Sequence, residues 1–172
     1  MRNDIHQHLG RTLDAQELEA VTRELSQRLD LWNHLVRHEP GKRIYEQLWR
    51  DQHLAAWVIC WMAEQDTGFH DHDVSSGAVT VVRGAVREQR LTLGAEPLTR
   101  VFEAGKSFSF AASDIHRVEH WGSGPAVTLH AYSPPLSRMG SYSVGEDGSL
   151  ARHSMSYAEE LRPLTPGVGL AA

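Results

Sequence analysis

The stretch HDHDVSSGAVTVVRG, residues 70–84, carries more information about fold and chemistry than any other part of this chain. Its second half, GAVTVVRG, sets β-branched residues between two glycines, which is typical of a strand. Successive side chains of a strand alternate between faces, so His70 and His72 are expected to point the same way and to hold one metal ion. Asp71 alternates to the other face, where we expect a solvent or loop role. The stretch therefore predicts a β-sheet protein with a metal site.

Short β-rich segments of the same kind follow one another from Ala55 onward, punctuated by glycine, serine and proline. They read AAWVICWM, GAVTVVRG, AVREQRLTL, LTRVFEAG, KSFSFAA, HRVEHW, AVTLHAYS and GSYSV. Such spacing favours an antiparallel sandwich or barrel. We therefore expect a mainly β fold with a small β-barrel over residues 54–157.

The N-terminal part predicts helices that pack on this barrel. Within residues 14–37, apolar side chains recur at helical spacing: Leu18, Val21, Leu25 and Leu29. The break at Pro40-Gly41 is followed by RIYEQLW (43–49), which we interpret as one more helical stretch. We expect one domain over residues 1–172, mainly helical at 1–50, with an irregular tail at 163–172.

Composition narrows the class of protein. The chain has 172 residues, 41% of them hydrophobic, and this is enough for one domain with its own core. Its formal charge of 17 − 22 = −5, without a basic run, disfavours nucleic acid or an anionic membrane as partner. No apolar stretch approaches membrane length, and MRNDIHQHLGRTLDAQ lacks the apolar core of a secretory signal. With Cys60 as the one cysteine, we expect a reducing, cytoplasmic location.

The histidines also fit the two-motif frame of the cupin barrels. In the first motif His-x-His is usually followed by a glutamate and then by a glycine; here Gly77 stands where the glutamate would sit, and Gly84 fills the closing position. The second motif ends at His116, the obvious third ligand. Three histidines without a carboxylate keep such a site more electropositive than a two-His-one-carboxylate triad, and ready to accept an anionic thiolate.

The order HDH…HRV…LHAYSPPL resembles cysteine dioxygenase and its bacterial thiol dioxygenase relatives, over roughly residues 43–142. The Tyr-Ser-Pro-Pro run after a strand histidine is far more discriminating than the histidine pair alone. The resemblance implies a cupin fold and a ferrous ion, Fe(II), as cofactor. The residues it implies as iron ligands are His70, His72 and His116.

The same resemblance implies a Ser-His-Tyr relay beside the metal, which maps onto Thr128, His130 and Tyr132. Alternation supports this, because the three residues share one face of a strand. Thr128 replaces the serine, and its hydroxyl can still bond to His130. Gly77 stands where animal enzymes carry the cysteine of a Cys-Tyr crosslink, so Tyr132 cannot be crosslinked in that way.

Two residues are candidates for binding the substrate carboxylate. Gln47, two residues after Tyr45, aligns with the arginine that pairs with the substrate carboxylate in cysteine-specific enzymes. Enzymes that prefer 3-mercaptopropionate resemble this chain in carrying glutamine there. Arg43, placed one helical turn before Gln47 in our interpretation, is the other candidate and would supply a positive charge. We expect Tyr45 and Trp61 to wall the pocket.

These observations predict an iron(II)-dependent thiol dioxygenase that adds both atoms of O2 to the sulfur of a small thiol carboxylate. Cysteine is the first choice of substrate and 3-mercaptopropionate an almost equal alternative; a bulkier thiol also stays open. The expected partners are the small thiol and O2, and the oligomeric state stays open, a monomer included. Two other classes remain: a non-oxidative cupin isomerase or lyase on Zn(II), Mn(II) or Ni(II), and a non-catalytic ligand-binding cupin.

Overall fold

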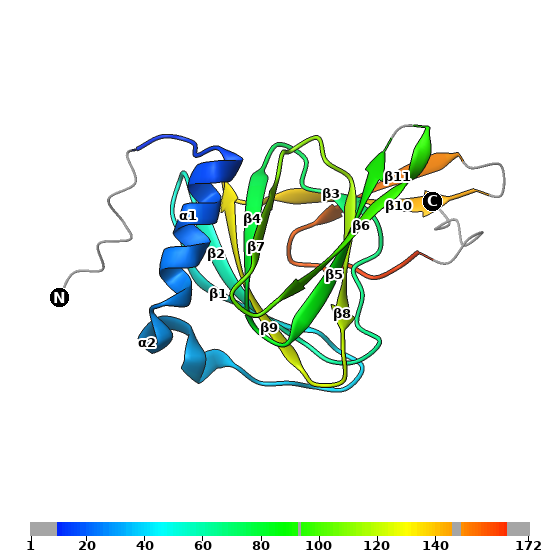
Figure 1. Cartoon of the computed structure of the whole chain (residues 1–172). Coiled ribbons are helices and arrows are strands. Elements are labelled where there is room, and N and C mark those ends of the chain that lie inside the picture. The colour runs from blue at the N-terminus through cyan, green and yellow to red at the C-terminus, as the bar shows by residue number, and fades with distance from the viewer. Residues whose placement is uncertain (1–9, 93, 146–148, 165–172) are drawn as a thin grey trace.

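The structure is a computed structural model that describes residues 10–92, 94–145 and 149–164. Two antiparallel sheets face each other, and the N-terminal helices cover the outer side of one of them (Figure 1). The predicted mainly β fold is confirmed. No helix in these residues is long and apolar enough to cross a membrane.

One sheet lies against the helices. Its strands, in spatial order, are β1 (Ile44–Arg50), β2 (Ala55–Trp61), β9 (Ala126–Ser133), β4 (Ser76–Arg83) and β7 (Ser107–Phe110). The second sheet contains β11 (Leu150–Ser156), β10 (Arg138–Val144), β3 (His70–Asp71), β8 (His116–Trp121), β5 (Ala85–Thr92) and β6 (Ala95–Glu103). Every pairing that is recorded between these strands is antiparallel.

The predicted N-terminal helices are present, but they end earlier than expected. Helix α1 (Ala15–Ser26) begins at a capping box, in which the Asp14 side chain accepts from the Glu17 backbone and the Glu17 side chain accepts from the Asp14 backbone. The short α2 (Leu29–Trp32) and the 3-10 helix η2 (Asn33–Leu35) follow. Helical structure in the described residues therefore stops at Leu35, well short of residue 50.

The helical interpretation of residues 43–49 is wrong. The segment forms the edge strand β1, paired with β2 from Ile44 opposite Cys60 to Arg50 opposite Ala55. Tertiary pairing outweighs the weak helical spacing of its apolar residues. Of the expected tail at 163–172, residues 165–172 lie outside the described part of the chain.

The central strand β9 is buried along its whole length, because helices cover one face and the barrel interior covers the other. Val127 and Leu129 belong to the core under the helices, where Cys60 is also buried. The intervening residues face the interior between the sheets, which brings polar side chains into the barrel.

Candidate metal centre and its pocket

Three buried histidines converge inside the barrel. His70 in β3 is paired directly with His116 in β8, and His72 lies just after β3. One ring nitrogen from each residue lies within 4.8 Å of the other two, an arrangement that could hold a metal ion. The residues are 3%, 1% and 1% exposed in the order His70, His72 and His116. The structure thus brings together the three predicted ligands.

Hydrogen bonds indicate which ring nitrogen carries the proton in two of the three histidines. His70 Nδ1 lies 3.0 Å from the Gly68 carbonyl oxygen, and His116 Nδ1 lies 2.9 Å from Oε1 of Glu88. Both partners only accept, so Nδ1 carries the proton in each ring and Nε2 keeps a free lone pair. His116 Nε2 is buried without a hydrogen-bond partner in the described residues, and so is His72 Nδ1. Orphaned ring nitrogens inside a histidine cluster are what a metal site requires.

Burial keeps these rings neutral. It lowers the pKa of His70 to about 4 and those of His72 and His116 well below their usual value. A metal-binding histidine must be neutral, so the electrostatics suit ligation. The nitrogen-only donor set fits a first-row transition metal rather than magnesium or calcium.

The predicted relay is also assembled, on the interior face of β9. Thr128 Oγ1 lies 2.8 Å from His130 Nε2, and His130 Nδ1 lies 3.1 Å from the Tyr132 hydroxyl oxygen. The ring centroid of Tyr132 is 5.4 Å from that of His72, which puts the relay beside the metal centre. Burial lowers the pKa of His130 to about 3 and raises that of Tyr132, so both side chains stay neutral near pH 7.

Trp61 sets the direction of this relay. Its Nε1 donates to Thr128 Oγ1 at 2.8 Å, and an indole N–H cannot accept. We assign the Thr128 hydroxyl hydrogen to His130 Nε2, because that contact is shorter than the 3.5 Å to the Ile59 carbonyl. With Nε2 accepting, Nδ1 carries the ring proton and donates to the Tyr132 oxygen. The Tyr132 O–H is thereby left to donate elsewhere.

The cavity beside the histidines receives three of the four predicted substrate-binding residues. Arg43, Tyr45 and Trp61 line it, whereas Gln47 is exposed and is not among the lining residues. Gln47 lies further along β1, opposite Trp57 and next to an irregularity in the strand register. Arg43 directly precedes the extended strand β1, and Gln47 lies within it. The expected helical relation between the two residues is therefore absent.

Arg43 places a buried cation in this cavity. The residue is 5% exposed, and its guanidinium carbon lies 4.9 Å from the centroid of the Trp61 ring. Nη2 donates to the Leu161 carbonyl at 2.6 Å, and the Arg43 backbone N–H donates to Oε1 of Glu160 at 2.9 Å. Burial lowers the Arg43 pKa, but a guanidinium keeps its charge at neutral pH.

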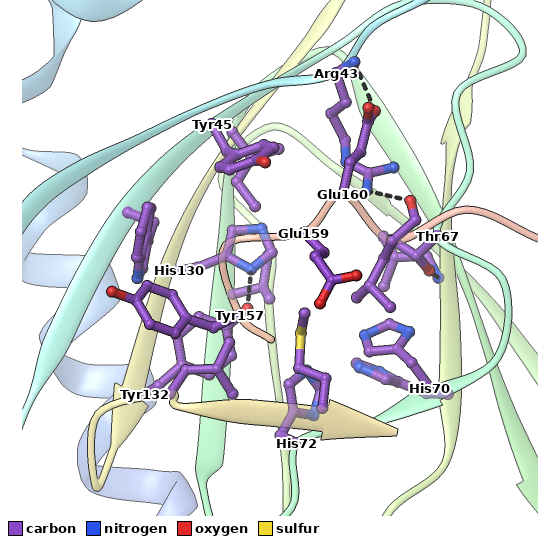
Figure 2. Close-up of a pocket in the computed structure, with 18 of the residues that line it drawn as sticks. Arg43, Tyr45, Thr67, His70, His72, His130, Tyr132, Tyr157, Glu159 and Glu160 are labelled. Atoms are coloured by element: carbon purple, nitrogen blue, oxygen red, sulfur yellow. Dashed lines mark hydrogen bonds between the residues drawn. The ribbon is translucent and has the colours of Figure 1, made fainter. Parts of the chain in front are cut away.

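A C-terminal segment that the sequence analysis did not predict lines part of the cavity. After β11 the chain turns back, and Tyr157, Glu159, Glu160 and Leu161 join the lining. The Tyr45 hydroxyl donates to the Ala158 carbonyl at 3.2 Å. Figure 2 shows the Glu159 carboxylate directed into the cavity, toward the side where His70 and His72 lie. Nothing in YAEEL marks this role, because its contacts are with residues more than a hundred positions earlier.

Phe110 fills the space beside Gly77. A Cβ added at Gly77 would lie 2.3 Å from Phe110 Cζ and 3.0 Å from Tyr132 Cδ1. The Phe110 ring is itself stacked on His72, with the ring centroids 4.4 Å apart. The Phe110 ring therefore occupies the space that a side chain at position 77 would need.

Asp71 does not have the expected solvent or loop role. It lies in β3 and is 7% exposed, with its carboxylate turned to the face opposite the histidines. There it accepts hydrogen bonds from Tyr142 Oη at 2.6 Å and from Nε and Nη2 of Arg152 at 2.6 and 2.8 Å. The alternation was predicted correctly, but the β10–β11 hairpin covers the face that we expected to be open.

The family model for cysteine dioxygenase type I matches residues 3–144 of the chain. No curated protein sequence matches this chain. The fold is similar to that of TT1209 from Thermus thermophilus, with a TM-score of 0.52 at 20% identity, over 59% of this chain and 92% of the other. A Klebsiella pneumoniae protein with a double-stranded β-helix domain gives 0.52 at 16% identity, over 70% and 91% of the two chains.

The cupin domain of Schizosaccharomyces pombe Cnp3 is also similar, with a TM-score of 0.50 at 10% identity, over 58% of this chain and 64% of the other. At such identities a likeness shows the fold alone. The predicted cupin architecture is confirmed.

Proposed function

Since the chain belongs to the cysteine dioxygenase type I family, we propose that it is an iron(II)-dependent thiol dioxygenase. In this proposal both atoms of O2 are added to the sulfur of a small thiol carboxylate, and the product is a sulfinic acid. Four electrons pass from the thiol sulfur to O2, so no external reductant is required. One observation carries the proposal: neutral histidines, the relay and a buried cation share one cavity.

Iron would be held by the free ring nitrogens of His70, His72 and His116. When bound, it supplies open coordination positions for sulfur and oxygen and stabilises the thiolate form of the substrate. A three-nitrogen set adds no negative charge among the direct ligands, which favours an anionic sulfur ligand. The remaining steps depend on the other residues of the cavity.

We propose Arg43, rather than Gln47, as the partner of the substrate carboxylate. Arg43 is buried in the cavity wall, whereas Gln47 is exposed and outside the lining. A guanidinium has five N–H donors, and the bond to Leu161 uses one at Nη2, so donors remain for a carboxylate. Trp61 under the guanidinium keeps it in position.

Tyr132 would act as a hydrogen-bond donor to the substrate or to oxygen. The relay from Trp61 through Thr128 and His130 leaves its O–H unused within the chain of bonds. Because burial raises the Tyr132 pKa, the phenol stays protonated at neutral pH and keeps this donor.

Glu159 favours cysteine over 3-mercaptopropionate as the substrate. Its carboxylate lines the same cavity as Arg43, so the cavity has an anionic and a cationic wall. Cysteine carries an ammonium and a carboxylate group that complement both, whereas 3-mercaptopropionate has only the carboxylate.

We propose the cytoplasm as the location, since Cys60 is a free, buried thiol.

Oxygen uptake by the iron-loaded protein tests the proposal directly. Cysteine, 3-mercaptopropionate and cysteamine would be compared, and the products identified by mass spectrometry. We expect cysteine to gain two oxygen atoms on sulfur and cysteamine, which lacks the carboxylate, to react poorly. Turnover of 3-mercaptopropionate in place of cysteine would contradict the role of Glu159. Absence of uptake with every thiol, despite bound iron, would contradict the dioxygenase itself.

A further inference from the structure

Behind the three histidines lies a buried carboxylate that has no part in the mechanism above. Glu88, in β5, is 1% exposed, and its Oε1 lies 2.9 Å from His116 Nδ1. The corresponding partner of His70 is a neutral backbone carbonyl, that of Gly68. His72 Nδ1 has no hydrogen-bond partner among the residues that the structure describes. Among the described residues, His116 is therefore the histidine of this cluster whose ring is hydrogen-bonded to a carboxylate.

Glu88 is held in place by the strand that carries it. Arg90, two residues further along β5, donates from Nη2 to the same Oε1 at 2.8 Å. Arg90 also donates from Nη1 to Asp114 Oδ2 at 3.0 Å, in the turn before His116. The register of β5 against β8 places Arg90 opposite His116. Glu88, Arg90 and His116 therefore form one hydrogen-bonded cluster.

Hydrogen bonding alone does not explain a carboxylate here. Both bonds end on Oε1, so the amide oxygen of a glutamine could accept the same two bonds. A glutamine would avoid the cost of burying an ionised group. The charge itself is the property that glutamate adds at this position.

We propose that Glu88 supplies, through His116, the negative charge that the metal centre lacks among its direct ligands. A carboxylate bonded to the far nitrogen of an imidazole makes the ring a stronger donor and fixes its orientation. Glu88 is thus a positioning and charge-tuning residue, separated by the His116 ring from the site that would hold the metal. The inference rests on the metal site of the proposed function but not on the thiol reaction, because it concerns the binding of a divalent cation and of anions.

Two equilibria separate this role from simple structural support. Loss of the charge should weaken the binding of a divalent cation and strengthen the binding of an anion at the loaded metal. Damage to the cluster would weaken both. Co²⁺ is the cation probe, measured by competition with a chelator, and azide is the anion probe, measured by its effect on the visible absorption of the Co²⁺-loaded protein.

In this experiment Glu88→Gln is expected to bind Co²⁺ about 10–100-fold more weakly than wild type. Its Co²⁺-loaded form should bind azide more tightly. The matched control is Glu46→Gln, which removes the same charge from an ion pair with Arg37 elsewhere on the surface. This control should leave both equilibria unchanged.

A third variant, Glu88→Asp, keeps the charge and shortens the side chain. It is expected to hold azide affinity near that of wild type even where Co²⁺ affinity falls. The proposal is overturned if Glu88→Gln binds Co²⁺ as tightly as wild type, or if its azide affinity does not rise. It is equally overturned if the aspartate and glutamine variants raise azide affinity alike. None of these outcomes depends on whether the protein oxidises thiols.

Discussion

Asp71 and Arg152 lie 81 residues apart in the chain and are joined by two hydrogen bonds, from Nε to Oδ2 at 2.6 Å and from Nη2 to Oδ1 at 2.8 Å. Asp71 stands between His70 and His72, two of the proposed metal ligands, in a strand of only two residues. Burial by itself would raise the Asp71 pKa, but the bonds from Arg152 and Tyr142 hold it well below its usual range. The β10–β11 hairpin therefore fixes the short strand that carries His70 and that leads directly into His72.

Removal of this clamp should destabilise the protein. Arg152→Met leaves the Asp71 carboxylate, whose side chain is 10% exposed, without its cationic partner. We expect the free energy of unfolding in urea to fall by about 1–3 kcal/mol. Arg138→Met is the control, because the Arg138 side chain is 72% exposed and its ion pair with Asp73 is long, at 3.7 Å. Its effect should stay within about 0.5 kcal/mol; equal effects of the two variants would contradict the clamp.

The relay predicts a loss of turnover in Tyr132→Phe without a loss of metal. The variant removes the hydroxyl that lies 3.1 Å from His130 Nδ1 and keeps the ring that packs near His72. One hydrogen bond made in the transition state is worth about 1.4 kcal/mol or more, so kcat/KM should fall at least about tenfold. Iron content, measured in parallel, should match that of wild type. Turnover at the wild-type rate would show that the relay has no catalytic role.

Arg43 and Gln47 should differ sharply in their effect on substrate binding. Arg43→Met removes the buried cation but keeps an apolar side chain against Trp61. Loss of a charge-assisted pair with the substrate carboxylate costs about 1.5–3 kcal/mol, so KM for cysteine should rise about 10–100-fold. Gln47→Ala, at an exposed position outside the cavity lining, should change KM little. The reverse order of the two effects would restore Gln47 as the substrate-binding residue.

The buried histidines should make the metal-free protein less stable in mild acid. The pKa of His130 is about 3 in the folded chain and about 6.5 when unfolded, so below pH 6.5 the unfolded state binds a proton that the folded state does not. Stability is therefore lost as the pH falls from 6.5 toward 4, by about 1.4 kcal/mol per pH unit for this residue. Urea unfolding at pH 7, 6 and 5 should show a shallower slope in His130→Gln. An identical slope would mean that His130 takes up its proton over the same pH range in the folded and the unfolded chain.

The fit of Phe110 beside Gly77 predicts a pair of compensating substitutions. Gly77→Ala places a Cβ 2.3 Å from Phe110 Cζ, which requires the ring to move. Overpacking of this kind costs about 1–3 kcal/mol of unfolding free energy. In the Phe110→Leu background the cost of Gly77→Ala should shrink, because the clashing ring atoms are gone. Additive effects in urea unfolding would show that the contact is not the source of the cost.

Local pattern was sufficient to predict which of the proposed ligands and relay residues share a face. His70 and His72 share a face, and so do Thr128, His130 and Tyr132, because the two-residue period of a strand is a property of the backbone itself. Even the direction of Asp71 followed from alternation. These features were predictable since they depend on neighbours in sequence.

Periodicity failed where a short segment could satisfy two patterns. Residues 43–49 carry apolar residues at a spacing compatible with a helix, yet pairing with β2 makes them a strand. That change of element removes the expected helical relation between Arg43 and Gln47. The outcome was decided by a partner strand rather than by the segment's own residues.

The sequence by itself determined which residues could bind a metal and which of them face the same way, because backbone geometry imposes this locally. Only the tertiary structure decided what surrounds them: the carboxylate of Glu88 behind His116, the Arg152 clamp on Asp71, and the Leu161 carbonyl on Arg43 across 118 residues of chain. These contacts join segments that are distant in sequence and lie together only after the two sheets have closed. Their partners are set by the packing of the whole barrel, and no periodicity in a single segment records that packing.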